Sequence, residues 1–422
     1  MHRLIRATSV AVAGLIISCA VLADSEKAEI SAARLSRIDG LLQQYVDERR
    51  IAGAVVLLLQ DGKPVYQRAT GWSDKESGRR MNEDTLFRIA SQSKAITSTA
   101  ALILMEDGKL VLDDAVGKYI PEFQKTTVAV QNDNGTVSYV PAKRPITIRD
   151  LLTHTSGMSY GTDAPVAAAY EAKGLGPAAG NGWYTADKNE PICDTMAKLG
   201  TLPFVAQPGE KWVYGYNTDV LGCVVERAAG LPLDEVIRTR ITGPLGMKDT
   251  FFYVPNNQRD RLATVYASGP DGSIVRAPEG SKGQGNYVDG PRRSFSGGAG
   301  LVSTARDYAR FLEMIRHEGE LDGTRILSPR SVALMHTNQI GTLYRTGAGF
   351  GLGFEVVGQY GSGGMGAPGN YGWGGAYGSL YRIDPQSNMT IVMMVQLMPN
   401  NTDFRDKFLN LVYSSILQPI RQ

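Results

Sequence analysis

The spacing of apolar and polar side chains predicts a mixture of helices and strands in the first quarter of the chain. Apolar residues recur at helical spacing over 31–49, which predicts an amphipathic helix. A nearly unbroken apolar run over 52–60 is followed by Asp61-Gly62 and a second short run over 64–67. Asp-Gly between two such runs is typical of a β-hairpin. The pattern then predicts two further elements, a short strand over 85–89 and an apolar helix over 94–105.

The middle of the chain has a different pattern, in which helical segments alternate with long loops. Its predicted elements are helices over 148–154, 219–229 and 232–240, and a hairpin centred on Asn134-Gly135. Beyond Gly297 the pattern again mixes helix and strand. The elements predicted there are a helix over 304–318, a glycine-rich loop over 347–375, strands over 377–383 and 390–397, and a last helix after Thr402.

Strands at both ends and helices in the middle predict an α/β (α+β) fold. We expect one antiparallel sheet, built from both chain ends and flanked by helices, with a mostly helical inserted domain. The predicted sheet domain comprises residues 24–115 plus 286–422, and the insertion comprises residues 116–285.

Residues 1–23 are interpreted as a targeting segment. Arg3 and Arg6 precede an uncharged apolar run that ends in small residues before Asp24, as in a secretory signal peptide. The run is shorter than the about 20 apolar residues that a membrane span needs. Alternatively, the segment before Cys19 resembles a lipoprotein box, in which case a lipid at Cys19 would be the only membrane attachment. Both interpretations predict export, to the periplasm or out of the cell.

Composition narrows the function classes. The chain of 422 residues has 44 Lys+Arg and 42 Asp+Glu, a balance that argues against a nucleic-acid partner. It has 3 Cys and 4 His without the spacing of a metal site, so neither a metal nor another cofactor is expected. An oxidising compartment would permit a disulfide between Cys193 and Cys223, and the alternative is two small apolar residues on helices.

Two serines are candidates for a nucleophile. Ser159 lies in Gly157-Met158-Ser159-Tyr160-Gly161, which matches the GxSxG nucleophile elbow. That motif needs a strand before it and a helix after it, whereas here a predicted helix precedes and a loop follows. Ser91 and Lys94 form an SxxK sequence where a short strand meets a helix. Residues i and i+3 share one helix face, the helix N-terminus favours negative charge, and a buried lysine can activate the hydroxyl.

Five segments, in order, resemble motifs of the serine β-lactamase and penicillin-binding-protein superfamily, in particular its class C β-lactamase-like branch. They span nearly the whole chain after the targeting segment. The segments are Phe87-Arg88-Ile89-Ala90-Ser91-Gln92-Ser93-Lys94, Leu151-Leu152-Thr153-His154-Thr155-Ser156-Gly157, Pro208-Gly209-Glu210-Lys211-Trp212-Val213-Tyr214, Gly297-Gly298-Ala299-Gly300-Leu301 and Tyr371-Gly372-Trp373-Gly374-Gly375.

The resemblance implies a role for each matched residue. Ser91 would be the acylated serine, and Lys94 and Tyr214 would form its base system. The backbone N–H groups of Ser91 and Ala376 would form the oxyanion hole. The residues implied to contact substrate are Tyr216, Trp373, Gly374 and Gly375, with Trp373 alternatively a packed strand aromatic.

Two departures from the lactamase pattern indicate the substrate class. Tyr216 replaces the usual asparagine of the second motif, and Trp373 replaces the lysine that would attract a substrate carboxylate. The chain therefore resembles family VIII carboxylesterases most, which implies cleavage of small acyl esters through an acyl-enzyme. A β-lactamase or a D-amino-acid peptidase of the same fold is the nearer alternative, and a catalytically idle peptide-binding protein is the distant one.

Two other patterns do not fit a function. Residues 361–366 match GxGxxG, but the expected strand before and helix after are missing from the pattern. SxxK chemistry needs no histidine, so His154, His317 and His336 are not assigned a catalytic role, and His154 is expected to pack beside the site.

Overall fold

The computed structural model describes residues 28–177, 185 and 187–420 of the chain. The segment predicted to be a targeting signal, with its predicted cleavage site and Cys19, lies outside the described residues. The main sheet has eight antiparallel strands in the spatial order β13-β14-β15-β16-β17-β1-β2-β3. Their bounds are β1 Gly53–Gln60, β2 Lys63–Asp74, β3 Arg79–Arg80, β13 Ala348–Phe350, β14 Glu355–Val357, β15 Tyr371–Gly374, β16 Leu380–Asp384 and β17 Met389–Met394.

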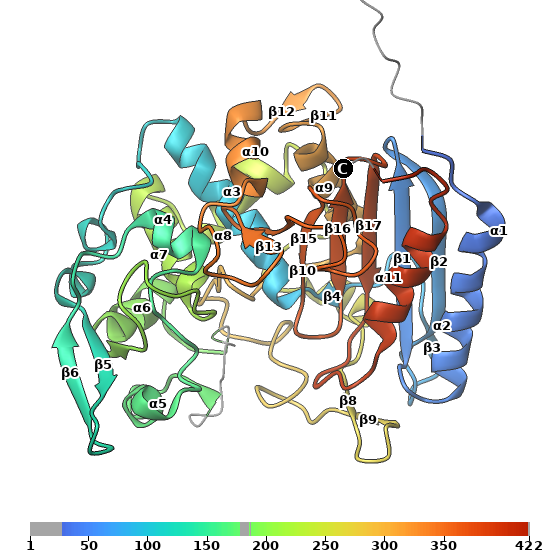
Figure 1. Ribbon diagram of the computed structural model, residues 1–422. Coiled ribbons are helices and arrows are strands. Elements are labelled where there is room, and N and C mark those ends of the chain that lie inside the picture. The colour runs from blue at the N-terminus through green and yellow to red at the C-terminus, as the bar shows by residue number, and fades with distance from the viewer. Residues whose placement is uncertain (1–27, 178–184, 186, 421–422) are drawn as a thin grey trace, which may run out of the picture.

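The two ends of the chain meet in this sheet, as the sequence predicts. β1 pairs with β2 on one side and with β17 on the other, so blue and red strands adjoin in Figure 1. Helices cover both faces of the sheet. The helices α1 (Ala32–Leu35), α2 (Arg37–Asp47) and α11 (Phe404–Ser414) lie on one face, and α3 (Ser93–Glu106) and α9 (Ala305–Arg316) on the other.

Coverage of both faces explains why β1 is an unbroken apolar run. Val55 and Leu57 belong to the core cluster that contains α3 and α9, whereas Val56 and Leu58 belong to the cluster that contains α2 and α11. Successive side chains in a strand point to opposite faces, so a strand buried on both sides needs apolar residues at every position.

The green part of the chain in Figure 1 lies beside the sheet and is mainly helical. Its elements are β5 Thr127–Gln131, β6 Val137–Pro141, α4 Ile148–Thr153, α5 Ala164–Glu171, α6 Ile192–Gly200, β7 Pro203–Phe204, α7 Asn217–Ala229 and α8 Leu233–Ile237. The β5–β6 hairpin confirms the turn predicted at Asn134-Gly135, and Gly135 has a φ of 81° there. One core cluster runs through both parts of the molecule, and the boundaries at 115 and 285 stay a prediction.

The prediction of a loop over 347–375 is wrong for three parts of this stretch, which supply β13, β14 and β15 to the main sheet, whereas residues 358–370 between β14 and β15 form no strand. Glycine weakens local strand preference, so the sequence pattern missed these strands. The structure shows a steric reason for glycine. A Cβ at Gly372 would lie 2.3 Å from the carbonyl oxygen of Tyr381 on β16.

Other elements differ from the prediction in their lengths or pairing. The segment predicted as a single helix over 31–49 divides into α1 and α2, and β2 extends well beyond residue 67. The predicted strand over 85–89 is the short β4 (Phe87–Arg88), which pairs with β10 (Val302–Ser303) outside the main sheet. The remaining elements, absent from the prediction, are β8 Tyr266–Ser268, β9 Ile274–Arg276, β11 Glu320–Leu321, β12 Thr324–Arg325 and α10 Pro329–His336.

A disulfide joins Cys193 on α6 to Cys223 on α7, with a Cα–Cα distance of 5.0 Å. Of the two alternatives for these cysteines, the structure therefore shows the bridge. It closes a sequence separation of 30 residues and ties α6 to α7. Because α7 begins directly after the Tyr214–Tyr216 segment, the bridge braces the helix that follows it.

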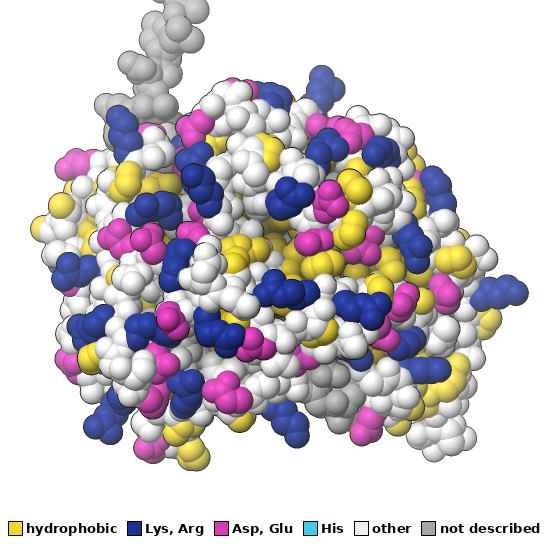
Figure 2. All heavy atoms as spheres, turned by 180° about the vertical axis from the view of Figure 1, so that it is seen from behind, with side chains coloured by type: hydrophobic (Ala, Val, Ile, Leu, Met, Phe, Trp, Pro, Cys, Tyr) yellow, Lys and Arg dark blue, Asp and Glu magenta, His cyan; other side chains and the backbone are white. Residues whose placement is uncertain are grey.

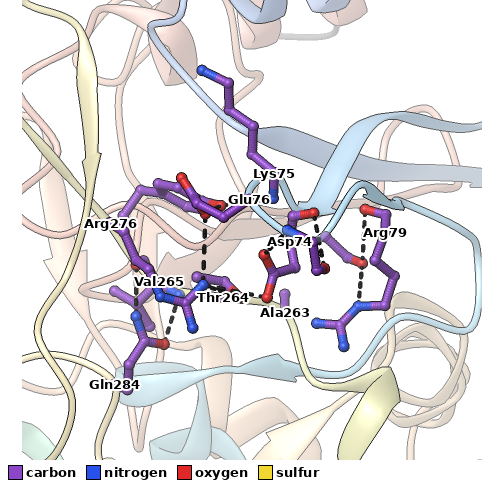
Figure 3. Close-up of polar contacts among 12 residues, drawn as sticks. Asp74, Lys75, Glu76, Arg79, Ala263, Thr264, Val265, Arg276 and Gln284 are labelled. Carbon is purple, nitrogen blue, oxygen red and sulfur yellow. Dashed lines mark hydrogen bonds and ion pairs between the residues drawn. The ribbon is translucent and has the colours of Figure 1, made fainter.

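Polar contacts attach the long segment before residue 290 to the sheet. Figure 3 shows Arg276 of β9 facing Asp74 at the end of β2, at 3.2 Å between Nη1 and Oδ2. Within the segment itself, the Gln284 side chain accepts from the N–H of Val265 and donates to its C=O. Charged side chains of both signs are interspersed on the face in Figure 2. Within the part of the chain that is described, no helix has the length and apolar character of a membrane span.

Candidate active site

Ser91 lies in a tight turn at the start of a buried helix. A single 3-10 turn, Ala90–Gln92, leads directly into α3. Ala90, just before the serine, has a φ of 44°, in the left-handed region that non-glycine residues seldom adopt. Strain of this kind persists only where surrounding structure holds it, and it gathers at functional sites. The turn therefore places the Ser91 hydroxyl at the positive end of the α3 dipole.

Lys94 reaches back to Ser91 from the first turn of α3. Its Nζ donates to Ser91 Oγ at 3.3 Å, to the carbonyl oxygen of Gly298 at 2.8 Å and to Tyr160 Oη at 3.1 Å. Only 3% of Lys94 is exposed. An ammonium group has three donors, and each has an acceptor here. The structure thus brings the predicted serine and lysine together.

Tyr160 is a site residue that the sequence analysis missed. It lies inside the GxSxG segment, and its hydroxyl, rather than that of Ser159, reaches Lys94. Burial raises the pKa of Tyr160 well above its usual value, and the neighbouring Tyr214 raises it further, so the hydroxyl stays protonated. Ser159 is buried and accepts from the N–H of Gly161 at 3.1 Å. The segment lies between α4 and α5, without the strand that a nucleophile elbow requires.

Tyr214 lies on the other side of Lys94. The Lys94 ammonium is 4.7 Å from the centre of the Tyr214 ring. The Tyr214 hydroxyl accepts from Trp373 Nε1 at 3.2 Å. Trp373 lines the cavity and also packs against Tyr214 and Phe350, which confirms the packed aromatic, and its contact with substrate stays a prediction.

A cavity of about 420 Å³ opens beside Ser91. Its lining includes Tyr214, the residues predicted for the oxyanion hole and the third motif, and four charged residues. These are Ser91, Tyr214, Trp373, Gly374, Gly375, Ala376, Glu355, Arg382, Arg405 and Asp406. The ladder between β14 and β15 ends at Gly372. The backbone of the next residues of β15 therefore faces the cavity as a short strand edge, which can hold an extended group.

Glycines at 297 and 298 allow Lys94 to approach a buried carboxyl group. Gly298 accepts from Lys94 through its C=O and donates through its N–H to Asp219 Oδ1 at 3.2 Å. A Cβ at Gly298 would lie 2.4 Å from Asp219 Oδ2, so no side chain fits there. Burial raises the pKa of Asp219, and the charge of Lys94 opposes that rise. The backbone N–H and C=O of Gly298 thus link the two ionisable groups.

Tyr216 and Asn217 are buried behind the site and contact the residues that form it. Tyr216, predicted to contact substrate, is fully buried instead: its hydroxyl accepts from the N–H of Gly176 at 3.1 Å, and its ring packs on Tyr160. The direct contact predicted for Tyr216 has no support in this arrangement. Asn217, which the sequence analysis did not single out, donates to the carbonyl oxygen of Val213 at 3.1 Å and accepts from Ser156.

His154 packs beside the site as expected. It ends α4 in the left-handed conformation and lies among Tyr214, Trp212 and Phe350. Burial lowers its pKa well below the usual value, and the nearby Lys94 lowers it further, so the ring is neutral. No group of three or more His, Cys, Asp or Glu side chains suited to a metal ion occurs among the residues described.

The fold and this site define a serine hydrolase of the β-lactamase fold. The chain belongs to the β-lactamase family, whose model, described as Beta-lactamase, matches residues 38–413. Esterase EstB of Burkholderia gladioli is 33% identical over 382 residues, covering 86% of this chain and 91% of that protein. Lovastatin esterase of Penicillium rubens is 32% identical over 387 residues, covering 85% and 92%.

A solved structure agrees with these relatives. The structure of EstCE1, described as a hydrolase with promiscuous acyltransferase activity, superimposes with a TM-score of 0.75 at 29% identity. The match covers 92% of this chain and 99% of that one.

Proposed function

We propose that this protein is an exported carboxylesterase that cleaves small acyl esters through an acyl-enzyme on Ser91. The observation that carries the proposal is the contact of Lys94 Nζ with Ser91 Oγ at 3.3 Å, beside a cavity edged by Trp373. The Lys94/Tyr214 pair, with one member unprotonated in the reacting state, accepts the Ser91 proton as Oγ attacks the ester carbonyl, and then gives that proton to the leaving alcohol. The N–H groups of Ser91 and Ala376 stabilise the oxyanion, the alcohol leaves, and water then releases the acid.

The charges around the cavity favour a neutral ester over a carboxylate-bearing β-lactam. Arg405 donates to three backbone carbonyl oxygens, those of Gly375, Gly378 and Ser379. Arg382 donates to two carbonyl oxygens and lies 3.9 Å from the carboxylate of Glu355. Nε and Nη2 of Arg405, and Nη1 and Nη2 of Arg382, are therefore already engaged. In the lactamase pattern, a lysine at the position of Trp373 would bind the substrate carboxylate. A charge-assisted contact of this kind contributes about 1.5–3 kcal/mol, so its absence lowers kcat/KM for a β-lactam by about ten- to a hundredfold.

The test of substrate class compares kcat/KM for p-nitrophenyl butyrate and for a chromogenic cephalosporin on one enzyme preparation. We expect clear turnover of the ester and weaker turnover of the cephalosporin. A preference for the cephalosporin would replace the esterase with a β-lactamase.

The test of the nucleophile uses a matched pair of variants. Ser91→Ala should abolish ester turnover and labelling by a fluorophosphonate, whereas Ser159→Ala should retain most of both. Equal loss in the two folded variants would remove the assignment, and loss at Ser159 alone would reverse it. A wild-type protein that is neither labelled nor active would indicate an idle binding protein.

Export forms part of the proposal, and the disulfide supports it. Bridges such as Cys193–Cys223 form and persist in oxidising compartments. Expression with residues 1–23 in a bacterial host should give a periplasmic or secreted protein beginning at Asp24, or a membrane-attached one beginning at a lipidated Cys19. Cytoplasmic, uncleaved protein would contradict export.

A further inference from the structure

Arg405 makes contacts that are unusual for an arginine beside a reaction site. It is the second residue of α11, and its side chain crosses to the turn that follows β15. Nε donates to the carbonyl oxygen of Gly378 at 2.8 Å, and Nη2 donates to those of Ser379, at 3.0 Å, and Gly375. Among the described residues, no carboxylate forms an ion pair with it. One guanidinium group thus gathers three carbonyl oxygens of a single turn.

The turn carries the proposed oxyanion-hole donor. The C=O of Gly375 and the N–H of Ala376 belong to one peptide unit, which is trans. In a trans peptide these two groups point in opposite directions. The Gly375 oxygen accepts from Arg405 and also from the N–H of Gly378 at 3.1 Å. Two donors on one oxygen fix the plane of the peptide, so they also fix the direction of the Ala376 N–H.

Close packing sets where this peptide lies relative to the serine. A Cβ at Gly375 would lie 2.7 Å from the carbonyl oxygen of Ile89, which begins the turn bearing Ser91. A Cβ at Gly374 would lie 3.4 Å from Arg405 Nη1. The peptide is therefore held between the serine turn on one side and the guanidinium group on the other.

The charge of Arg405 has a second effect on the same peptide. An arginine side chain stays protonated in proteins, and a cation at a carbonyl oxygen polarises the amide. Polarisation makes the N–H at the other end of the peptide a stronger donor. An N–H that is both fixed and polarised before the reaction stabilises developing negative charge without reorganisation.

We propose that Arg405 is a positioning residue that orients and polarises the Gly375–Ala376 peptide, so that its N–H serves as an oxyanion-hole donor. This inference rests on the proposed function, because it concerns the transition state of acylation at Ser91. Arg405 stands in the cavity wall, but its Nε and Nη2 donors are taken by the turn, and the inference gives it a role through that peptide rather than through a contact with the substrate. Its removal should therefore lower kcat and leave KM largely unchanged, since substrate binding does not use it.

The experiment uses Arg405→Ala and Arg405→Lys in the full chain, with Arg325→Ala as the matched control. Arg325, in β12, also donates to two backbone carbonyl oxygens, those of Glu318 and Leu327, which flank the hairpin of β11 and β12. For p-nitrophenyl butyrate we expect Arg405→Ala to lose about ten- to a hundredfold in kcat, somewhat less than the loss of a donor itself. Arg405→Lys should fall between Arg405→Ala and wild type, and Arg325→Ala should keep the wild-type kcat.

Two further measurements separate positioning from a merely structural role. Ethylguanidinium added to Arg405→Ala should restore part of kcat, because it supplies the missing donor group. A phenylboronic acid forms an adduct with Ser91 that places an oxygen in the oxyanion hole. Its inhibition constant should rise in Arg405→Ala by the same factor by which kcat falls.

The inference is overturned if folded Arg405→Ala keeps the wild-type kcat, or if its loss lies in KM and ethylguanidinium restores nothing. If Arg405→Ala does not fold, a folded Arg405→Lys with normal kcat and normal boronate binding overturns it. If the wild-type protein hydrolyses esters through Ser91, either of these results overturns only the role of Arg405 and leaves the proposed function standing. An inactive wild type would instead overturn the proposed function, and this inference with it.

Discussion

Replacing Tyr160 by phenylalanine removes one hydroxyl from beside the site lysine and changes no other atom. That hydroxyl accepts from Lys94 Nζ at 3.1 Å, and the remaining acceptors are Ser91 Oγ and the carbonyl oxygen of Gly298. Lys94 is only 3% exposed, so water has little access to replace the lost acceptor. The ammonium group of the variant is left with one donor unmatched.

The expected loss of kcat/KM in Tyr160→Phe follows from the hydrogen bond that is lost. A hydrogen bond to a charged group contributes about 1.5–3 kcal/mol. If Tyr160 holds Lys94 in place for proton transfer, that energy corresponds to a loss of about ten- to a hundredfold in kcat/KM. Part of the cost can instead reduce the free energy of unfolding, because a buried donor without a partner destabilises the native state.

The assay measures kcat/KM for p-nitrophenyl butyrate and the urea unfolding curve for the same preparations. Tyr170→Phe is the matched control: its hydroxyl is buried without a hydrogen-bond partner among the described residues, so its removal should leave activity and stability unchanged or slightly improved. A Tyr160→Phe variant with wild-type kcat/KM and wild-type stability would refute the reasoning. Equal losses in both variants would trace the effect to packing of the tyrosine cluster.

Three further predictions follow from the same geometry. Tyr214→Phe should lower the rate by at least about a hundredfold, the scale of a positioned proton-transfer group, while the protein still folds; a near-normal rate would exclude Tyr214 from the base system. Reduction of Cys193–Cys223 should lower the free energy of unfolding by about 3–4 kcal/mol, given the separation of 30 residues, as measured in urea with and without dithiothreitol; equal curves in the two conditions would contradict this. Burial lowers the pKa of His154 in the folded protein and keeps it neutral, whereas the unfolded chain protonates it below about pH 6.5. The free energy of unfolding should therefore fall as the pH drops below this value, by up to about 1.4 kcal/mol per pH unit from this residue. His154→Asn, which suits the left-handed backbone, should flatten that slope between pH 7 and 4.5, and an unchanged slope would count against it.

Local pattern predicted much of the fold. β1 and α3 are strongly apolar segments that local pattern identifies. The hairpin at Asn134-Gly135 has the dipeptide that is most typical of hairpin turns. The strands in 347–375 could not be predicted in this way. Their glycines have low strand preference, and only the crowding by β16 makes glycine necessary there.

The site shows the same division. Ser91 and Lys94 are three positions apart at a helix start, so the sequence alone places them together. Tyr160 and Arg405 carry no such signal, because one lies in a loop between two helices and the other on the last helix of the chain. Their roles depend on which backbone atoms they reach across long sequence separations.

The sequence by itself determined the helix and strand periods, the order of the motifs and the serine–lysine pair, because each depends on residues close together along the chain. The tertiary structure decided that Tyr160 rather than Ser159 reaches Lys94, that Tyr216 is buried behind the site, and that Arg405 holds the turn after β15. Those outcomes depend on burial and on hydrogen bonds between distant segments. Such contacts are set when the sheet closes and the helices pack against it, which a linear pattern does not encode.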